Sequence, residues 1–123
     1  MIRIRLAAAA LNQTPMNWDA NCRNIQAALA AAREAQVGIL CLPELCLSGY
    51  GCEDMFFSAG IQRRSLALLE EVLPDTMGLV VCLGLPVFFE GALYNAAAIV
   101  CDGQLLGVVA KQHLAGDGLH YAP

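Results

Sequence analysis

The chain has 123 residues, of which 58% are hydrophobic and 15% are charged, and its formal net charge at pH 7 is −4. This length fits one domain, this apolar fraction excludes a disordered protein, and the negative charge argues against a nucleic-acid-binding surface. Charged residues, glycines and prolines interrupt the apolar runs so often that we expect no membrane-spanning helix.

The first two predicted elements are a strand and a helix. Residues 2–11 begin with Ile and Leu alternating with Arg and continue as small apolar residues, which is typical of a strand that runs inward from an exposed start. A helix follows, capped by Asn17 or Asp19 and extending to about Gln36. Its predicted inward face consists of Cys22, Ile25, Leu29 and Ala32.

Two apolar runs and a second helix continue this pattern. Residues 39–42 end at Pro43 and predict a buried central strand, and residues 79–85 predict another. Between these strands, Ser58 caps a helix that Pro74 ends. The predicted inward face of this helix consists of Ile61, Leu68, Leu69, Val72 and Leu73.

The order strand, helix, strand, helix, strand predicts a parallel α/β core with right-handed crossovers. Residues 87–90, 93–101 and 104–110 then form strands with very short connections, and Asp102-Gly103 is a two-residue hairpin signal. We therefore expect the sheet to become antiparallel after Pro86, so that the whole sheet is mixed.

Six cysteines are present, and four of them lie in or beside apolar runs, where a free cysteine behaves as a small hydrophobic residue. These four are Cys41, Cys46, Cys82 and Cys101, and we expect Cys41 and Cys82 to be core residues. The pattern indicates a reduced, cytoplasmic protein. The cysteines and the two histidines lack the spacing of zinc ligands, so we expect no metal site.

Lys111 is the first candidate for a chemical role. It is the single lysine beside six arginines, and it directly follows the apolar run 105–110. Lysine is a compact point charge whose pKa changes with burial, which suits it to catalysis. A solvent-exposed lysine at the end of a strand explains the same position, so both interpretations stay open.

Glu44 is the second candidate, because it follows the predicted strand 39–42 and lies between Pro43 and Leu45. Ligands of open α/β sheets bind beyond the carboxyl ends of the strands. A carboxylate among apolar neighbours is costly to bury without a partner such as a lysine. Such a carboxylate can act as a general base, and a solvated loop carboxylate is the alternative.

Residues 48–56 form a turn-rich loop in which two glycines flank Tyr50. This composition fits a loop that brings Tyr50 close to a ligand, and equally a plain connection to the second helix. We interpret Glu53 and Asp54 as charges at the start of a helix rather than as catalytic acids.

Several segments resemble one known family. Residues 42–50 (LPELCLSGY) resemble the glutamate motif of the nitrilase superfamily, and residues 111–114 (KQHL) resemble its lysine motif. Longer stretches are similar to the amino-terminal glutaminase domain of glutamine-dependent NAD synthetase, and the resemblance spans essentially the whole chain. These stretches are residues 12–15, 43–56, 83–86 and 110–121.

The resemblance implies an α/β fold, the nitrilase-like α-β-β-α sandwich, of which residues 1–123 form a single, incomplete amino-terminal part. It implies Glu44 as general base, Lys111 as the stabiliser of the tetrahedral intermediate, and a cysteine as nucleophile. By the same resemblance, Tyr50 lines the glutamine pocket, and Asp117 orients Lys111 or binds the substrate amine.

The family's nucleophile follows the lysine motif, but none of the six cysteines follows Lys111. We therefore expect an amino-terminal fragment that is inactive as a glutaminase by itself. The complete enzyme is expected to hydrolyse glutamine and to supply ammonia for ATP-dependent synthesis of NAD from deamido-NAD. These residues contain no glycine-rich phosphate loop, so ATP and Mg²⁺ are expected at a missing carboxyl-terminal synthetase domain.

Two other classes of function stay open. A stand-alone amidase or carbamoylase of the same superfamily is equally compatible with Glu44 and Lys111. A non-catalytic binding or assembly module is the second alternative. The chain has too few charged residues to cover its apolar ones, so we expect apolar surface to stay exposed. Exposed apolar surface favours association, so we expect a homo-oligomer.

Overall fold

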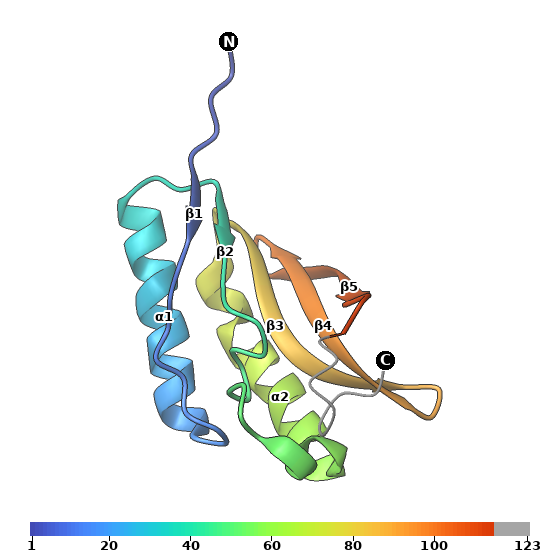
Figure 1. The fold of residues 1–123 in the computed structure, drawn as a ribbon. Helices are drawn as coiled ribbons and strands as arrows, with labels where there is room; N and C mark the ends of the chain where they lie inside the picture. Colours follow the sequence, from blue (N-terminus) through green and yellow to red (C-terminus); the bar gives the residue numbers. More distant parts are fainter. Residues whose placement is uncertain (115–123) are drawn as a thin grey trace.

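Five strands form one sheet in the order β1-β2-β3-β4-β5, so each strand lies beside the next one in the sequence (Figure 1). The computed structural model describes residues 1–114 of the chain. Asp117, for which the resemblance implies a substrate contact, lies outside the described residues. The strands are Leu6–Ala8 (β1), Ile39–Cys41 (β2), Val80–Phe89 (β3), Ala92–Cys101 (β4) and Gln104–Ala110 (β5).

The sheet is mixed, as the sequence predicts. β2 pairs in parallel with both β1 and β3, whereas β4 pairs antiparallel with both β3 and β5. The direction therefore changes between β3 and β4. The predicted break at Pro86 is wrong, because β3 is one continuous strand on both sides of this proline.

Pro86 fits inside β3 because the backbone nitrogen at this position points away from β4. Proline has no N–H to donate, and none is needed there. The Cys82 carbonyl accepts the N–H of Leu42 on the β2 side of the strand. The Gly84 carbonyl accepts the N–H of Leu47 on that same side. Alternate residues of a strand repeat this direction, so Pro86 faces a region beyond the end of β2 and costs no hydrogen bond to β4.

The two helices, α1 (Trp18–Glu34) and α2 (Ala59–Val72), begin where the sequence predicts. The side chains of Asn17 and Ser58 accept hydrogen bonds from N–H groups of the first turns of α1 and α2, respectively. Asn17 is therefore the cap of α1, and Asp19 lies in its first turn.

Both helices cover the same face of the sheet (Figure 1), as two successive right-handed crossovers in one direction require. The predicted inward faces are confirmed except at Leu73, which is half-buried in the short 3₁₀ helix Leu73–Thr76. Alternate side chains of β3 and β4 complete this core. Its buried members include Cys22, Ile25, Leu29, Ala32, Leu68, Leu69, Val72, Val81, Leu83, Leu85, Ala98 and Val100.

The opposite face of the sheet carries no helix or second sheet within residues 1–114 (Figure 1). Several side chains on it are exposed, and Val109 is 60% accessible to solvent. The prediction that residues 39–42 form a buried strand therefore holds for the face toward the helices and is wrong for the opposite face. Leu40 is buried under the helices, whereas Ile39 and Cys41 lie on the open face, so Cys41 is not a core residue. Cys82, on the neighbouring strand β3, is only half-buried, so the prediction of a core residue is wrong there as well.

β1 is much shorter than the predicted strand of residues 2–11. It is an edge strand, and its three residues pair with the three residues of β2. Because β2 ends just before Pro43, β1 has no neighbour along which to continue.

Among the described residues, no helix is long and apolar enough to cross a membrane.

Candidate active site

Glu44 lies on a loop that leaves β2 and continues along β3. The Leu42 N–H donates to the Cys82 carbonyl at 2.9 Å, and the Leu47 N–H donates to the Gly84 carbonyl at 3.2 Å. Between these two bonds the chain turns at Leu45, whose φ of 51° is left-handed. The loop thus takes over from β2 as the neighbour of β3.

Gly84 allows the loop to lie directly on the strand. A Cβ atom on residue 84 would lie 2.3 Å from the backbone nitrogen of Leu45 and 2.7 Å from the carbonyl oxygen of Pro43. Both distances are far inside van der Waals contact, so a larger residue would displace the loop. The absence of a side chain at Gly84 therefore sets the position of Glu44 above the sheet.

A buried amide holds the same loop from the α1 side. Asn21 is fully buried, and its Nδ2 donates to the carbonyl oxygens of Thr14 at 2.9 Å and Leu47 at 3.4 Å. Its Oδ1 accepts the N–H of Thr14 at 2.9 Å. Gln13 Nε2 donates to the Cys46 carbonyl at 2.7 Å. These bonds join the loop after β1, the first turn of α1 and the Glu44 loop.

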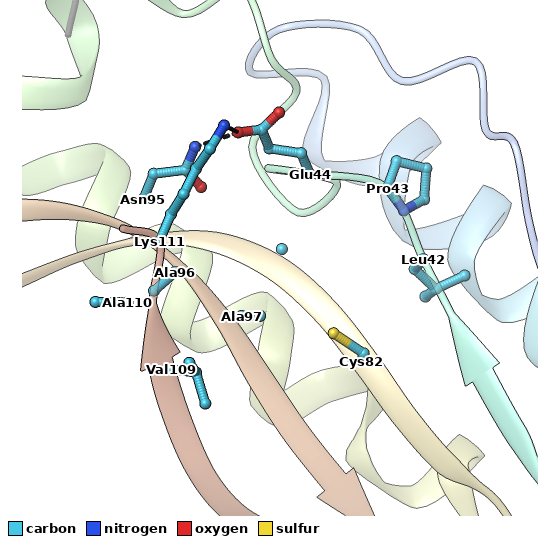
Figure 2. Close-up of a pocket in the computed structure, with 11 residues that line it drawn as sticks. Leu42, Pro43, Glu44, Cys82, Asn95, Ala96, Ala97, Val109, Ala110 and Lys111 are labelled. Carbon is cyan, nitrogen blue, oxygen red and sulfur yellow. Dashed lines mark hydrogen bonds and ion pairs between the residues drawn. The ribbon is translucent and has the colours of Figure 1, made fainter. Parts of the chain in front are cut away.

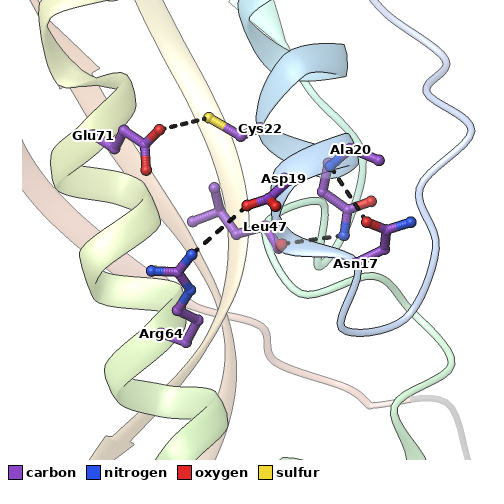
Figure 3. A network of polar contacts seen from close by, with 8 residues as sticks. Asn17, Asp19, Ala20, Cys22, Leu47, Arg64 and Glu71 are labelled. Atoms are coloured by element: carbon purple, nitrogen blue, oxygen red, sulfur yellow. Dashed lines mark hydrogen bonds and ion pairs between the residues drawn. The ribbon is translucent and has the colours of Figure 1, made fainter.

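Figure 3 shows Leu47 beside the first turns of α1, where α1 also contacts α2. Asp19 and Arg64 form an exposed ion pair at 3.9 Å. Cys22 Sγ donates to Glu71 Oε1 at 3.5 Å. Burial and this carboxylate raise the pKa of Cys22 to about 11, so Cys22 is a protonated donor between the helices.

Lys111 and Asn95 are neighbours across the β4–β5 ladder. Ala96 pairs with Ala110, and one residue further the Lys111 N–H donates to the Asn95 carbonyl at 2.7 Å. Side chains that are opposite each other in a ladder lie on the same face of the sheet. The register therefore places the Lys111 and Asn95 side chains together on the open face.

These two side chains meet Glu44 (Figure 2). Lys111 Nζ donates to Glu44 Oε1 at 2.7 Å, and Asn95 Nδ2 donates to the same oxygen at 2.5 Å. The Lys111 and Glu44 side chains are each 38% exposed, so the ion pair is only partly shielded from water.

The Lys111 ammonium is electrostatically stabilised in this position. Its hydrogen bond to Glu44 is the main cause that raises the pKa of Lys111 above its ordinary value. The negative charge of Glu44 and the nearby Tyr50 act in the same direction, and partial desolvation opposes them. Lys111 is therefore a cation throughout the physiological pH range.

The ion pair closes one end of a pocket of about 340 Å³. Apart from Glu44, Asn95 and Lys111, the lining is apolar or small, so a ligand would meet polar groups at one end only (Figure 2). Among residues 1–114, no group of His, Cys, Asp and Glu side chains could hold a metal ion. The lining residues are Leu42, Pro43, Glu44, Cys82, Gly84, Asn95, Ala96, Ala97, Val109, Ala110 and Lys111.

The structure brings Glu44 and Lys111 together, and their catalytic roles stay predictions. Tyr50 is 48% exposed and does not line the pocket, and its role in binding substrate stays a prediction. Glu53 and Asp54 lie in the first turn of a short 3₁₀ helix, as their interpretation as helix-start charges requires.

Asn95 is a site residue that sequence reasoning missed. A signal was present, since asparagine is depleted in strands and here lies within the otherwise apolar run 92–101.

The six cysteines all lie within the described residues. Cys22 donates to Glu71 between the helices, Cys41 pairs with Cys82 across β2 and β3, and Cys101 is six residues along β4 from Asn95. Cys46 is buried, and burial raises its pKa to about 12. Cys52 is buried as well. Cys82 lines the pocket but pairs with Ile99, four residues along β4 from Asn95, which is about 13 Å. A thiol must come within hydrogen-bond distance of its general base.

Comparisons with known proteins give this geometry a family context. The model of the carbon–nitrogen hydrolase family matches residues 5–123. The glutamine-dependent NAD(+) synthetase of Oryza sativa subsp. indica is 33% identical over 117 residues, and that of Thermotoga maritima is 35% identical over 121. These alignments cover 94% and 97% of this chain but only 16% and 21% of the relatives, so the chain spans about a fifth or less of their length.

Solved structures give the same picture. A glutamine-dependent NAD(+) synthetase from Cytophaga hutchinsonii matches with a TM-score of 0.91 and 43% identity, over 96% of this chain and 20% of that chain. The NitN amidase from Neterenkonia sp. AN1 matches with a TM-score of 0.82 over 98% of this chain and 49% of that chain. The amidase is only 20% identical, so this second match shows a shared fold alone.

Proposed function

This chain belongs to the carbon–nitrogen hydrolase family and has its nitrilase-like α/β fold, and from this premise we propose that residues 1–123 are part of a glutamine-hydrolysing domain. The domain supplies ammonia to the ATP-dependent synthesis of NAD from deamido-NAD. Similarity to synthetases over nearly the whole chain supports this choice of reaction. The observation that carries the proposal is the 2.7 Å contact between Lys111 Nζ and Glu44 Oε1 at the end of the pocket.

Glu44 and Lys111 have complementary roles in the proposed reaction. Glu44 takes the proton of a cysteine thiol, and the thiolate attacks the amide carbon of glutamine. A C–S bond forms, the C–N bond breaks, and Glu44 returns the proton to the leaving ammonia. The Lys111 ammonium faces the negative charge that develops on the amide oxygen. Water then hydrolyses the thioester to glutamate.

The nucleophilic thiol in this proposal lies outside residues 1–123. Cys46 and Cys52 are buried, and Cys82 is about 13 Å along the sheet from Asn95, which holds the Glu44 carboxylate. By themselves, residues 1–123 therefore provide a base and a cation but no nucleophile, and they are inactive as a glutaminase.

The remaining parts of the proposal concern the whole protein. ATP and Mg²⁺ bind to a synthetase domain outside residues 1–123, and glutamine is the substrate of the domain to which this chain belongs. The protein is cytoplasmic. The open sheet face, with exposed Ile39 and Val109, supports burial against further protein and a homo-oligomeric assembly.

A stand-alone amidase is the second candidate function. The NitN amidase shares its fold with this chain, and a shared fold at 20% identity does not choose between the two reactions. The same Glu44–Lys111 pair serves both reactions. An amidase hydrolyses simple amides without any synthesis of NAD, and this separates the two candidates.

The test is a Glu44→Gln variant of the native protein that contains this chain. We expect glutamine hydrolysis to fall by about 10²- to 10⁴-fold, because the variant lacks the proton acceptor. NAD formation from added ammonia should be unchanged. Glu70→Gln is the matched control, since Glu70 is exposed on α2, away from the pocket.

Three outcomes separate the candidates. Retained glutamine hydrolysis in Glu44→Gln contradicts the role of Glu44. Hydrolysis of simple amides without any formation of NAD supports the stand-alone amidase. A native protein with neither activity, in a folded wild-type form, supports the non-catalytic binding or assembly module.

A further inference from the structure

Two hydrogen-bond donors share one oxygen of Glu44. Lys111 Nζ and Asn95 Nδ2 both donate to Oε1, at 2.7 and 2.5 Å. Figure 2 shows the other oxygen, Oε2, directed away from both donors. Two donors therefore hold one oxygen of the carboxylate, and its other oxygen points away from them.

Asn95 is held more firmly than the group it contacts. It lies within β4, opposite Pro86 of β3 on one side, and its carbonyl accepts the N–H of Lys111 on the other. Glu44, in contrast, lies on an irregular loop, and Lys111 has a long, flexible side chain. The short side chain of Asn95 thus holds Oε1 of the Glu44 carboxylate in one position relative to β4.

The chemistry of an amide suits this position. Asn95 donates to the carboxylate without adding a charge, so Lys111 and Glu44 remain a pair of one cation and one anion. An aspartate of the same shape would place two carboxylates beside a single ammonium. Among residues 1–114, the ionisable side chains that line the pocket are Glu44, Lys111 and the Cys82 thiol, and Tyr50 acts on Lys111 from outside the lining.

We propose that Asn95 is a positioning residue of the glutaminase site: its amide fixes Oε1 of Glu44, so that Oε2 moves the proton between the thiol and the leaving ammonia. This inference rests on the proposed function. The thiol proton passes to Oε2 as the C–S bond forms, and the same proton leaves on ammonia when the C–N bond then breaks. No oxidant or other co-reactant is needed.

The test compares Asn95→Ala and Asn95→Asp in the native protein that contains this chain, with glutamate release as the readout. We expect kcat to fall about 10- to 100-fold in Asn95→Ala, with KM for glutamine changed less than about twofold. Loss of a donor destabilises the ionised carboxylate, so the acidic limb of the kcat/KM profile moves to higher pH. Asn95→Asp adds a negative charge, and its limb should move further in the same direction.

Tyr94→Phe is the matched control, because it removes a hydroxyl from the next residue of β4, whose side chain points to the other face of the strand. It should leave the pH profile unchanged. A merely structural role for Asn95 would lower the amount of active protein without moving the acidic limb. Should Asn95→Asp fail to fold, Asn95→Ala decides the question alone.

The outcomes keep the inference separate from the proposed function. If Glu44→Gln retains glutamine hydrolysis, the proposed function fails. If Glu44→Gln loses it while the acidic limb stays in place in the Asn95 variants, or only KM rises, the role of Asn95 is overturned and the proposed function stands.

Discussion

The two sides of the candidate site are positioned in different ways. Lys111 and Asn95 are placed by the antiparallel ladder of β4 and β5, in which each residue's neighbour follows from the register. Glu44 lies on an irregular loop, whose place depends on distant residues such as Gly84 and Asn21. We call Lys111 and Asn95 the ladder half of the site and Glu44 the loop half. The strand register positions the ladder half, whereas contacts with residues distant in sequence position the loop half.

The largest effect is expected where the loop rests on the strand. In Gly84→Ala, the added Cβ would lie 2.3 Å from the nitrogen of Leu45, so the loop must move and carry Glu44 away from Lys111. We expect glutamine hydrolysis to fall at least about 100-fold and the protein to lose about 1–3 kcal/mol of stability. Glutamate release and urea unfolding measure the two effects.

Gly107→Ala is the control for this substitution, because a Cβ atom there would meet nothing within 4 Å. It lies in β5, in the ladder half, and should leave both quantities nearly unchanged. Equal losses in Gly84→Ala and Gly107→Ala would contradict the claim that the loop half is the more sensitive one.

A smaller effect is expected at the buried amide that holds the loop from α1. Asn21→Ala removes the bonds to Thr14 and Leu47 and leaves their backbone groups without these partners. We expect a loss of about 1–3 kcal/mol in the free energy of unfolding and about a tenfold loss of glutamine hydrolysis. Arg23→Ala, at an exposed position of the same helix, is the control. Full activity in a destabilised Asn21→Ala would show that the loop keeps its place without this anchor.

The smallest effect concerns the titration of Lys111. Glu44 raises the pKa of Lys111 above its ordinary value. The stability that the ion pair contributes is therefore complete below the unfolded-state pKa and is lost as pH rises through the folded-state pKa. Glu44→Gln should therefore lower the pKa of Lys111. NMR titration of its side chain, assigned by comparison with Lys111→Met, measures the difference. An unchanged titration would mean that the ion pair is absent in solution.

The helices and their caps could be predicted from sequence because their signals are local. Asn17 and Ser58 are polar residues just before a run of helical periodicity, and both are caps, Asn17 being one of the two residues predicted for the first helix. Glu44 and Lys111 could be singled out because each follows an apolar strand. Their contact could be inferred only from the resemblance to a family, since 67 residues separate them.

The predictions that failed depend on neighbours that are distant in sequence. A run of three or four apolar residues does not reveal whether both faces of its strand are covered, and Ile39 lies on the uncovered face. The strand break at Pro86 was predicted from the residue type, but whether a proline interrupts a ladder depends on where β2 ends. Asn95 was missed because its role needs Glu44 and Lys111 beside it.

The central claim is that Glu44 and Lys111 act together on one chemical step. The most direct test measures glutamate release by Glu44→Gln, Lys111→Met and the double variant of the native protein. Residues that act as a unit have non-additive effects, so the double variant should be about as slow as the slower single variant. Synthesis of NAD from ammonia should continue in all three. Losses that multiply in the double variant, or near-normal glutamine hydrolysis in either single variant, would contradict the claim.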